Sequence, residues 1–115
     1  MAIRGYHAHI YFDPDELPQA EALAAAARDA FGCPVGHFHA APVGPHPRGS
    51  CQLTLHPEAF ARFAIWAPEA RGNLTIFAHG LSGDDLADHS RYVVWFGASE
   101  TLDITIFGRQ ELQPG

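Results

Sequence analysis

The run of residues 5–12 alternates between two sets of side chains, and this alternation restricts the fold more than any other feature of the chain. Successive side chains of a β-strand point to opposite faces, so the run predicts a strand with two distinct faces. One face carries Tyr6, Ala8, Ile10 and Phe12, and the other carries His7, His9 and Tyr11. The two histidines leave the strand on the same side, and together they offer half of a metal site.

The remaining segments predict a β-α-β-β-α-β order. Residues 20–31 are rich in alanine, with apolar residues at helical spacing, and they lie between an acidic start at residues 13–16 and Gly32. Residues 35–40 predict a strand with Val35, His37 and His39 on one face. A loop rich in proline and glycine (residues 43–49) precedes a strand at 50–56, a helix at 57–67 and a strand at 73–79. Residues 92–97 fit either a helix or a strand, and residues 102–107 predict an edge strand.

This order predicts an α+β fold, the ferredoxin-like sandwich with a C-terminal extension. Two right-handed crossovers joined by a hairpin place both helices on one face of an antiparallel sheet, with the predicted strands in the spatial order 4-1-3-2. We expect residues 1–115 to form a single domain, because a chain of this length buries one core. The other sheet face is expected to be open and to carry His7, His9, Tyr11, His37, His39, Gln52, Thr54, His56, Thr75, Phe77 and His79.

Composition points to metal or proton chemistry. The eight histidines outnumber the seven Lys and Arg residues together. A net charge of −6 argues against nucleic acid or an anionic membrane surface as a partner. We see no pattern of a signal peptide and no apolar run of about 18 residues, so a cytoplasmic protein is the expectation.

The predicted strand order brings some of the histidines together. The end of the 73–79 strand lies beside the start of the first strand, so His79 is expected near His7 and His9, and the end of the 50–56 strand brings His56 to the same rim. His46 lies in the loop of residues 43–49, near the opposite end of the first strand. It reaches the cluster only if this loop folds over the sheet or if a second copy of the chain supplies it.

The residue types around the histidines are compatible with zinc or iron. Structural zinc sites favour cysteine, and Cys33 and Cys51 lack a ligand-like spacing. Neutral imidazoles with open positions suit iron, and a carboxylate would complete the common two-His-one-carboxylate set. The candidate carboxylates are Asp13, Asp84, Asp85 and Asp88.

Three motifs together are similar to one known family. Tyr6-His7-Ala8-His9-Ile10-Tyr11-Phe12-Asp13, Val43-Gly44-Pro45-His46-Pro47 and Asp88-His89-Ser90 with Val94-Trp95-Phe96-Gly97 occur in this order. In sequence and spacing they resemble the DOPA 4,5-dioxygenase family of small aromatic-ring-cleaving enzymes.

The resemblance implies a non-haem iron(II) extradiol dioxygenase acting with dioxygen on a catechol such as 3,4-dihydroxyphenylalanine. It implies His7, His9 and His79 as metal ligands, with Fe(II) as the expected ion and Zn as an alternative in the purified protein. His46 and His89 become candidates for proton transfer or substrate anchoring. Three aromatic residues are expected either to line a ring-sized pocket or to belong to the core: Tyr11, Phe77 and Trp95. Arg48 is expected either to hold a substrate carboxylate or to be a plain surface residue.

A second hypothesis is a non-catalytic metal- or small-ligand-binding protein. The open sheet face predicted for this fold offers area for a second copy, so we expect a homodimer under either hypothesis. The fold alone does not separate the two, because it supports many functions.

Overall fold

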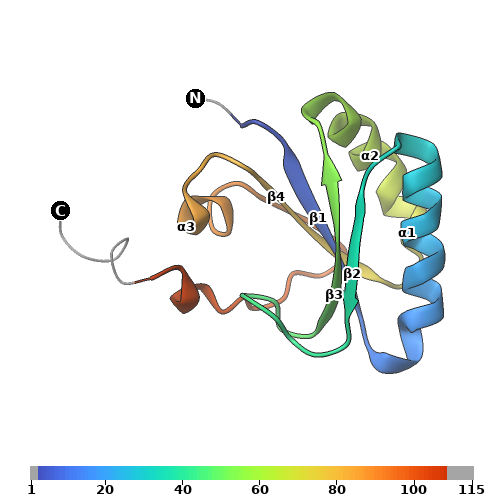
Figure 1. The fold of residues 1–115 in the computed structure, drawn as a ribbon, viewed down its shortest axis with the longest axis horizontal. Helices are drawn as coiled ribbons and strands as arrows, with labels where there is room; N and C mark the ends of the chain where they lie inside the picture. The colour runs from blue at the N-terminus through green and yellow to red at the C-terminus, as the bar shows by residue number, and fades with distance from the viewer. Residues whose placement is uncertain (1–2, 109–115) are drawn as a thin grey trace.

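The computed structural model describes residues 3–108 of the chain. A five-stranded antiparallel sheet forms one layer, and two long helices, α1 and α2, form a second layer on one of its faces (Figure 1). The strands are β1 (Tyr6–Phe12), β2 (Val35–His39), β3 (Gly49–Leu55), β4 (Thr75–Gly80) and β5 (Val93–Phe96). The helices are α1 (Leu17–Phe31), α2 (Pro57–Ala70) and the short α3 (Asp85–Asp88), with 3₁₀ turns η1 (Pro14–Glu16) and η2 (Ile104–Phe107).

The strand order is β2-β3-β1-β4-β5, which confirms the predicted α+β sandwich and its order of the first four strands. The segment that fitted either helix or strand is β5, which adds an antiparallel strand beside β4. Within residues 3–108, no helix has the length and apolar character needed to span a bilayer.

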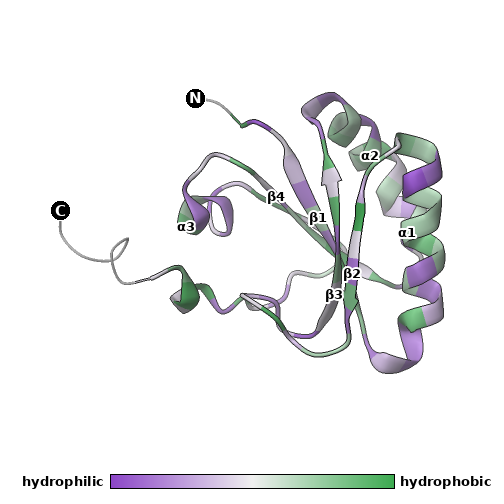
Figure 2. Ribbon diagram, viewed as in Figure 1, coloured by the Kyte–Doolittle hydropathy of each residue, from purple (hydrophilic) through white to green (hydrophobic). Residues whose placement is uncertain are grey.

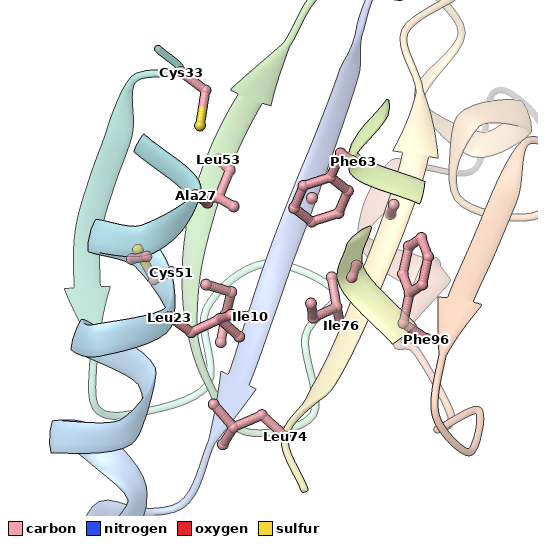
Figure 3. Close-up of a cluster of buried hydrophobic side chains, with 14 of the residues drawn as sticks. Ile10, Leu23, Ala27, Cys33, Cys51, Leu53, Phe63, Leu74, Ile76 and Phe96 are labelled. Carbon is pink, nitrogen blue, oxygen red and sulfur yellow. The ribbon is translucent and has the colours of Figure 1, made fainter. Parts of the chain in front are cut away.

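The core lies between the sheet and the two long helices. Ile10, Leu53 and Ile76 come from the three central strands and are fully buried against the helices (Figure 3). Small residues at Ala20, Ala24 and Ala27 let α1 lie close to the sheet, while its outer side carries both hydrophilic residues and exposed alanines (Figure 2). As predicted, α1 ends at Gly32, whose φ of 65° lies in the left-handed region that favours glycine.

The second strand departs from the strict alternation expected for residues 35–40. Val35 pairs with Leu53 and Phe38 with Cys51, so three steps along β2 match two steps along β3. The extra residue is a β-bulge. Val35 and Phe38 both pack against the core, so the prediction that Val35 shares a face with His37 is wrong.

The prediction of an edge strand at residues 102–107 is also wrong. Asp103 caps η2 by accepting a hydrogen bond from the Thr105 amide, and its own amide donates to the Pro45 carbonyl at 2.9 Å. These bonds divert the chain from the sheet edge. The segment lies with α3 on the side of the sheet away from α1 and α2 (Figure 1), and η2 is one of the most hydrophobic stretches there (Figure 2).

Candidate metal centre

Three histidines converge on the sheet face opposite α1 and α2, which we call the histidine face. His7, His9 and His79 each offer one ring nitrogen, and these three atoms lie within 4.8 Å of one another. The Nε2 atoms of His9 and His79 are 3.1 Å apart. His9 and His79 are buried and His7 is half-buried. These residues, here called the histidine triad, could hold a metal ion.

The register of β1 against β4 produces this convergence. His7 lies directly opposite His79 in the antiparallel pair, and His9 lies two residues further along β1 on the same face. Directly opposed side chains in such a pair have Cβ atoms about 5 Å apart, within reach of a shared ion. The neighbour geometry expected from the sequence is therefore present.

Backbone carbonyls orient two of the imidazoles. His79 Nδ1 lies 3.1 Å from the Gly80 carbonyl oxygen, which only accepts hydrogen bonds, so Nδ1 carries the proton. In the neutral ring this leaves the lone pair on Nε2, the atom that faces His9. His89 Nδ1 lies 2.8 Å from the Asp85 carbonyl oxygen, with the same consequence for its Nε2. Such bonds fix the tautomer that a metal ligand or a base requires.

Burial keeps the central imidazoles neutral. It lowers the pKa of His79 to about 4 and, together with the neighbouring His89, opposes a positive charge there. It also lowers the pKa of His46 to about 4. The pKa of His9 falls well below its ordinary value, first through burial and then through the adjacent imidazoles, and that of His7 is lowered mainly by burial. Neutral imidazole is the form that binds metal ions.

His46 reaches the triad from its own chain. The loop between β2 and β3 folds over the histidine face, so that the His46 ring centroid lies 4.1 Å from that of His9. His46 Nδ1 is 2.8 Å from the hydroxyl of Tyr11, which is fully buried. Of the two routes that the sequence left open, the structure shows the folded loop, and a second copy is not needed to bring His46 to the triad.

His89 lies on the other side of the triad. It follows α3, and its ring centroid is 4.0 Å from that of His79 and 4.4 Å from that of Phe107 in η2. Buried Asp88 accepts hydrogen bonds from the Ser82 amide and hydroxyl and so holds α3 against the loop after β4. His46, His9, His79 and His89 therefore form a row of imidazoles across the sheet.

Comparison with known proteins shows which family the chain belongs to. A family model described as the Dopa 4,5-dioxygenase family matches residues 6–106. The chain belongs to this family. It is 31% identical over 112 residues to a DOPA 4,5-dioxygenase of Amanita muscaria, an alignment that covers 89% of the chain and 49% of the relative. The chain thus spans about half the length of that relative.

A solved structure shows the same fold. The crystal structure of a proposed dioxygenase from Nostoc punctiforme superposes with a TM-score of 0.78 at 35% sequence identity. The superposition covers 95% of this chain and 94% of the other. The likeness in fold therefore extends over nearly all of both chains.

The donor set of the triad is all imidazole. None of the candidate carboxylates belongs to the group of converging ligand atoms found within residues 3–108. Asp88 accepts from Ser82, Asp84 caps α3 through the Ala87 amide, and Asp85 begins that helix. Asp13 pairs with Arg48 at 3.1 Å. The triad therefore differs from the two-His-one-carboxylate set considered from the sequence.

Arg48, expected to bind a substrate carboxylate, holds a carboxylate of its own chain. Its Nε and Nη2 donate to the two oxygens of Glu100 at 3.1 and 2.8 Å, and its Nη1 donates to Asp13 at 3.1 Å. Paired with Glu100, the Arg48 guanidinium has a raised pKa. No pattern in the sequence pointed to Glu100, which lies 52 residues away in an irregular segment after β5.

The remaining predicted residues fall into two groups. Phe77 is buried beneath the row, with Trp95 at 4.6 Å and Tyr11 at 6.3 Å between ring centroids, so these aromatics form the floor of the site. His56 lies outside the triad, because β3 ends at Leu55 and His56 becomes the exposed residue that precedes α2. The expectation that His56 shares the rim of the triad is therefore wrong.

The lowered histidine pKa values predict how the metal-free protein responds to acid. The unfolded chain takes up protons on these histidines below about pH 6.5, whereas folded His46 and His79 resist protonation until about pH 4. The free energy of unfolding should therefore fall as the pH is lowered through this window, on the order of a few kcal/mol at about 1.4 kcal/mol per pKa unit. Urea denaturation at a series of pH values measures this.

Two variants make the measurement specific. His46→Gln should reduce the slope of stability against pH, because one buried titrating group is removed. His56→Gln, at an exposed position outside the row, should leave the slope unchanged. A stability that is flat between pH 7 and pH 5 would contradict the neutral, buried state of the row.

Proposed function

We propose that the protein is an extradiol dioxygenase that uses Fe(II) to cleave the ring of a catechol such as 3,4-dihydroxyphenylalanine. Membership of the Dopa 4,5-dioxygenase family supports the reaction class. One structural observation carries the proposal: two further histidines flank the triad. The ring centroid of His46 lies 4.1 Å from that of His9, and that of His89 lies 4.0 Å from that of His79. Neither belongs to the group of converging ligand atoms formed by the triad. A site built this way separates ligands from proton-transfer groups.

The donor set fits the proposed ion. Three neutral imidazoles hold a divalent transition metal and leave other coordination positions open, and this choice of ligands suits iron as well as zinc. A ferrous ion held by His7, His9 and His79 would supply the redox chemistry that joins a catechol to dioxygen. In the overall reaction both oxygen atoms of dioxygen enter the product, and one carbon–carbon bond of the ring breaks to give an aldehyde and a carboxylic acid.

His46 is suited to accept a proton from a ring hydroxyl. Tyr11 and His46 can exchange donor and acceptor roles across their 2.8 Å contact, and the proposal places the His46 proton on Nδ1, donated to the Tyr11 oxygen. In that tautomer the lone pair of the neutral ring lies on Nε2, where it can accept the substrate proton. Burial, with a further contribution from Glu100, raises the pKa of Tyr11, so its phenol stays protonated and neutral while it orients the ring. Tyr11 is thus a positioning residue in this proposal.

His89 is suited to anchor the substrate from the other side. Its Nδ1 donates to the Asp85 carbonyl oxygen, 2.8 Å away. In the neutral ring, Nε2 can therefore accept a hydrogen bond from a second substrate hydroxyl or take the proton of that hydroxyl. The ring is held between His79 and Phe107, which limits its rotation. Buried Phe77 lies below, with its ring centroid 6.0 Å from that of His89, and gives this part of the face an apolar floor.

Oxygen uptake tests the proposal directly. Protein reconstituted with Fe(II) under argon and then mixed with aerated 3,4-dihydroxyphenylalanine should consume one dioxygen per catechol and form a yellow ring-cleavage product. No uptake with a broad panel of catechols would contradict the proposal. Tight metal binding without uptake would point instead to the non-catalytic metal-binding protein considered from the sequence.

Single substitutions should separate ligands from proton-transfer residues. His9→Ala and His79→Ala should lower metal affinity at least about 100-fold, since even the loss of an outer hydrogen bond to a ligand costs about 10–100-fold. His46→Ala and His89→Ala should retain the metal and lose turnover by about 10²–10⁴-fold. Metal analysis and oxygen uptake on the same samples measure both quantities.

The exposed His56→Ala variant is the matched control and should retain both metal and turnover. Loss of the metal from His46→Ala or His89→Ala would show that the assignment of ligands is wrong.

We also propose that the protein forms a homodimer. Three large apolar residues are exposed on this side of the molecule: Val43 (37%), Ile104 (38%) and Ile106 (50%). A Cβ on Gly44 would lie 3.9 Å from the Ile106 side chain, so the loop that follows β2 lies close to η2. Together the loop and η2 expose an apolar surface. Such surfaces commonly mark contacts between proteins. Light scattering should give twice the chain mass at micromolar concentration, and Ile106→Ser should shift it toward the monomer. A wild-type monomer would contradict this proposal.

A further inference from the structure

A cavity of about 210 Å³ lies beside the triad, between β2, β3 and the loop that carries His46. His9 and His46 line its inner end. His37, His39, Ser50 and Gln52 form the rest of its polar lining. The cavity therefore connects the row of imidazoles with the edge strand of the sheet, and its size suits a short substituent rather than a second ring system.

The β-bulge in β2 places His37 and His39 at this cavity. Because Val35 and Phe38 both face the core, the residues between them are left for the other side of the sheet. His37 and His39 are exposed there, with ring centroids 4.7 Å apart. Gly36, also in the bulge, lines the cavity and has little room for a side chain, since a Cβ would lie 3.2 Å from the Gln52 carbonyl oxygen. Bulges often re-aim side chains next to active sites.

The chemistry of the lining selects the charge of the ligand. The chain has 13 acidic residues, yet none of them lines this cavity. Its polar groups are imidazoles, a hydroxyl and an amide, all of which can donate hydrogen bonds. A carboxylate accepts several such bonds, whereas an ammonium group would find no negative partner here. Arg48, the residue expected to hold a substrate carboxylate, is already paired with Glu100 and Asp13.

We propose that this cavity binds the carboxylate tail of the substrate, and that His37 and His39 determine specificity by donating hydrogen bonds to it. This inference rests on the proposed function for the position of the ring, which lies at the triad with its tail directed past His9 and His46. It assigns no proton-transfer role to His37 or His39. Substrates with a short carboxylate side chain are therefore preferred to catechols with a neutral one.

Binding in the absence of dioxygen tests this without turnover. The probes are 3,4-dihydroxyphenylpropionate, which has the tail, and 4-methylcatechol, which lacks it. Their dissociation constants are measured by NMR titration on metal-free and on Zn(II)-loaded protein. For each form of the protein, the constant for 4-methylcatechol divided by that for 3,4-dihydroxyphenylpropionate removes the contribution of the ring. Wild-type protein should bind the carboxylate probe about 10- to 100-fold more tightly, as expected for hydrogen bonds to a charged group.

The variants locate the effect. The double variant H37A/H39A should bring the ratio close to one, whereas H37Q/H39Q, which keeps side-chain donors, should retain a larger ratio than the alanine variant. H56A, an exposed histidine outside the cavity, should keep the wild-type ratio. A wild-type ratio of one, an unchanged ratio in H37A/H39A, or no saturable binding of either probe to either form of the protein would overturn the proposal.

The outcome is distinguishable from that of the proposed function. A ratio that depends on His37 and His39 in a protein that consumes no dioxygen supports the carboxylate subsite and contradicts the dioxygenase. Oxygen uptake together with a ratio that is unchanged by substitution of these two histidines supports the dioxygenase and contradicts the carboxylate subsite.

Discussion

The pairing register between β1 and β4 is the constraint on which the rest of the site depends. It places His7 opposite His79 and, on the other face, Ala8 opposite Ala78 and Ile10 opposite Ile76. A slip of one residue would turn the His79 side chain toward the helices and expose Ile76. The hydrophobic core therefore fixes the geometry of the triad, because any other register would take buried apolar side chains out of contact with α1 and α2.

A second layer of contacts covers part of the polar sheet face. The Arg48–Glu100 pair joins the end of the His46 loop to the segment after β5, and the Asp103 amide bonds to Pro45 in the same loop. Phe107 closes the row beyond His89. These covering segments bury His9, His46 and His79, and that burial is what lowers the pKa of each ring. The neutral state of these imidazoles then follows from the segments that cover the sheet rather than from the sheet alone.

The sequence predicted the parts of the structure that follow from local periodicity. Alternation in residues 5–12 and the β-α-β-β-α-β order were enough to bring His79 to His7 and His9. It could not predict contacts between irregular segments, and so left the place of His46 open and missed Glu100. The expectation of strict alternation also failed at the bulge in β2, because the extra residue puts Val35 and Phe38, three positions apart, on the same face of the sheet. The apolar residues near 102–107 resemble a strand, but Asp103 caps a 3₁₀ turn there and diverts the chain.

A crystal structure of the metal-loaded protein, with anomalous data collected at the absorption edge of the metal, tests the central claim most directly. The account predicts one fully occupied ion bound by ring nitrogens of His7, His9 and His79, with His46 and His89 nearby but outside its coordination. An ion bound by His46 or His89 in place of a member of the triad, or an ion elsewhere on the chain, would contradict it.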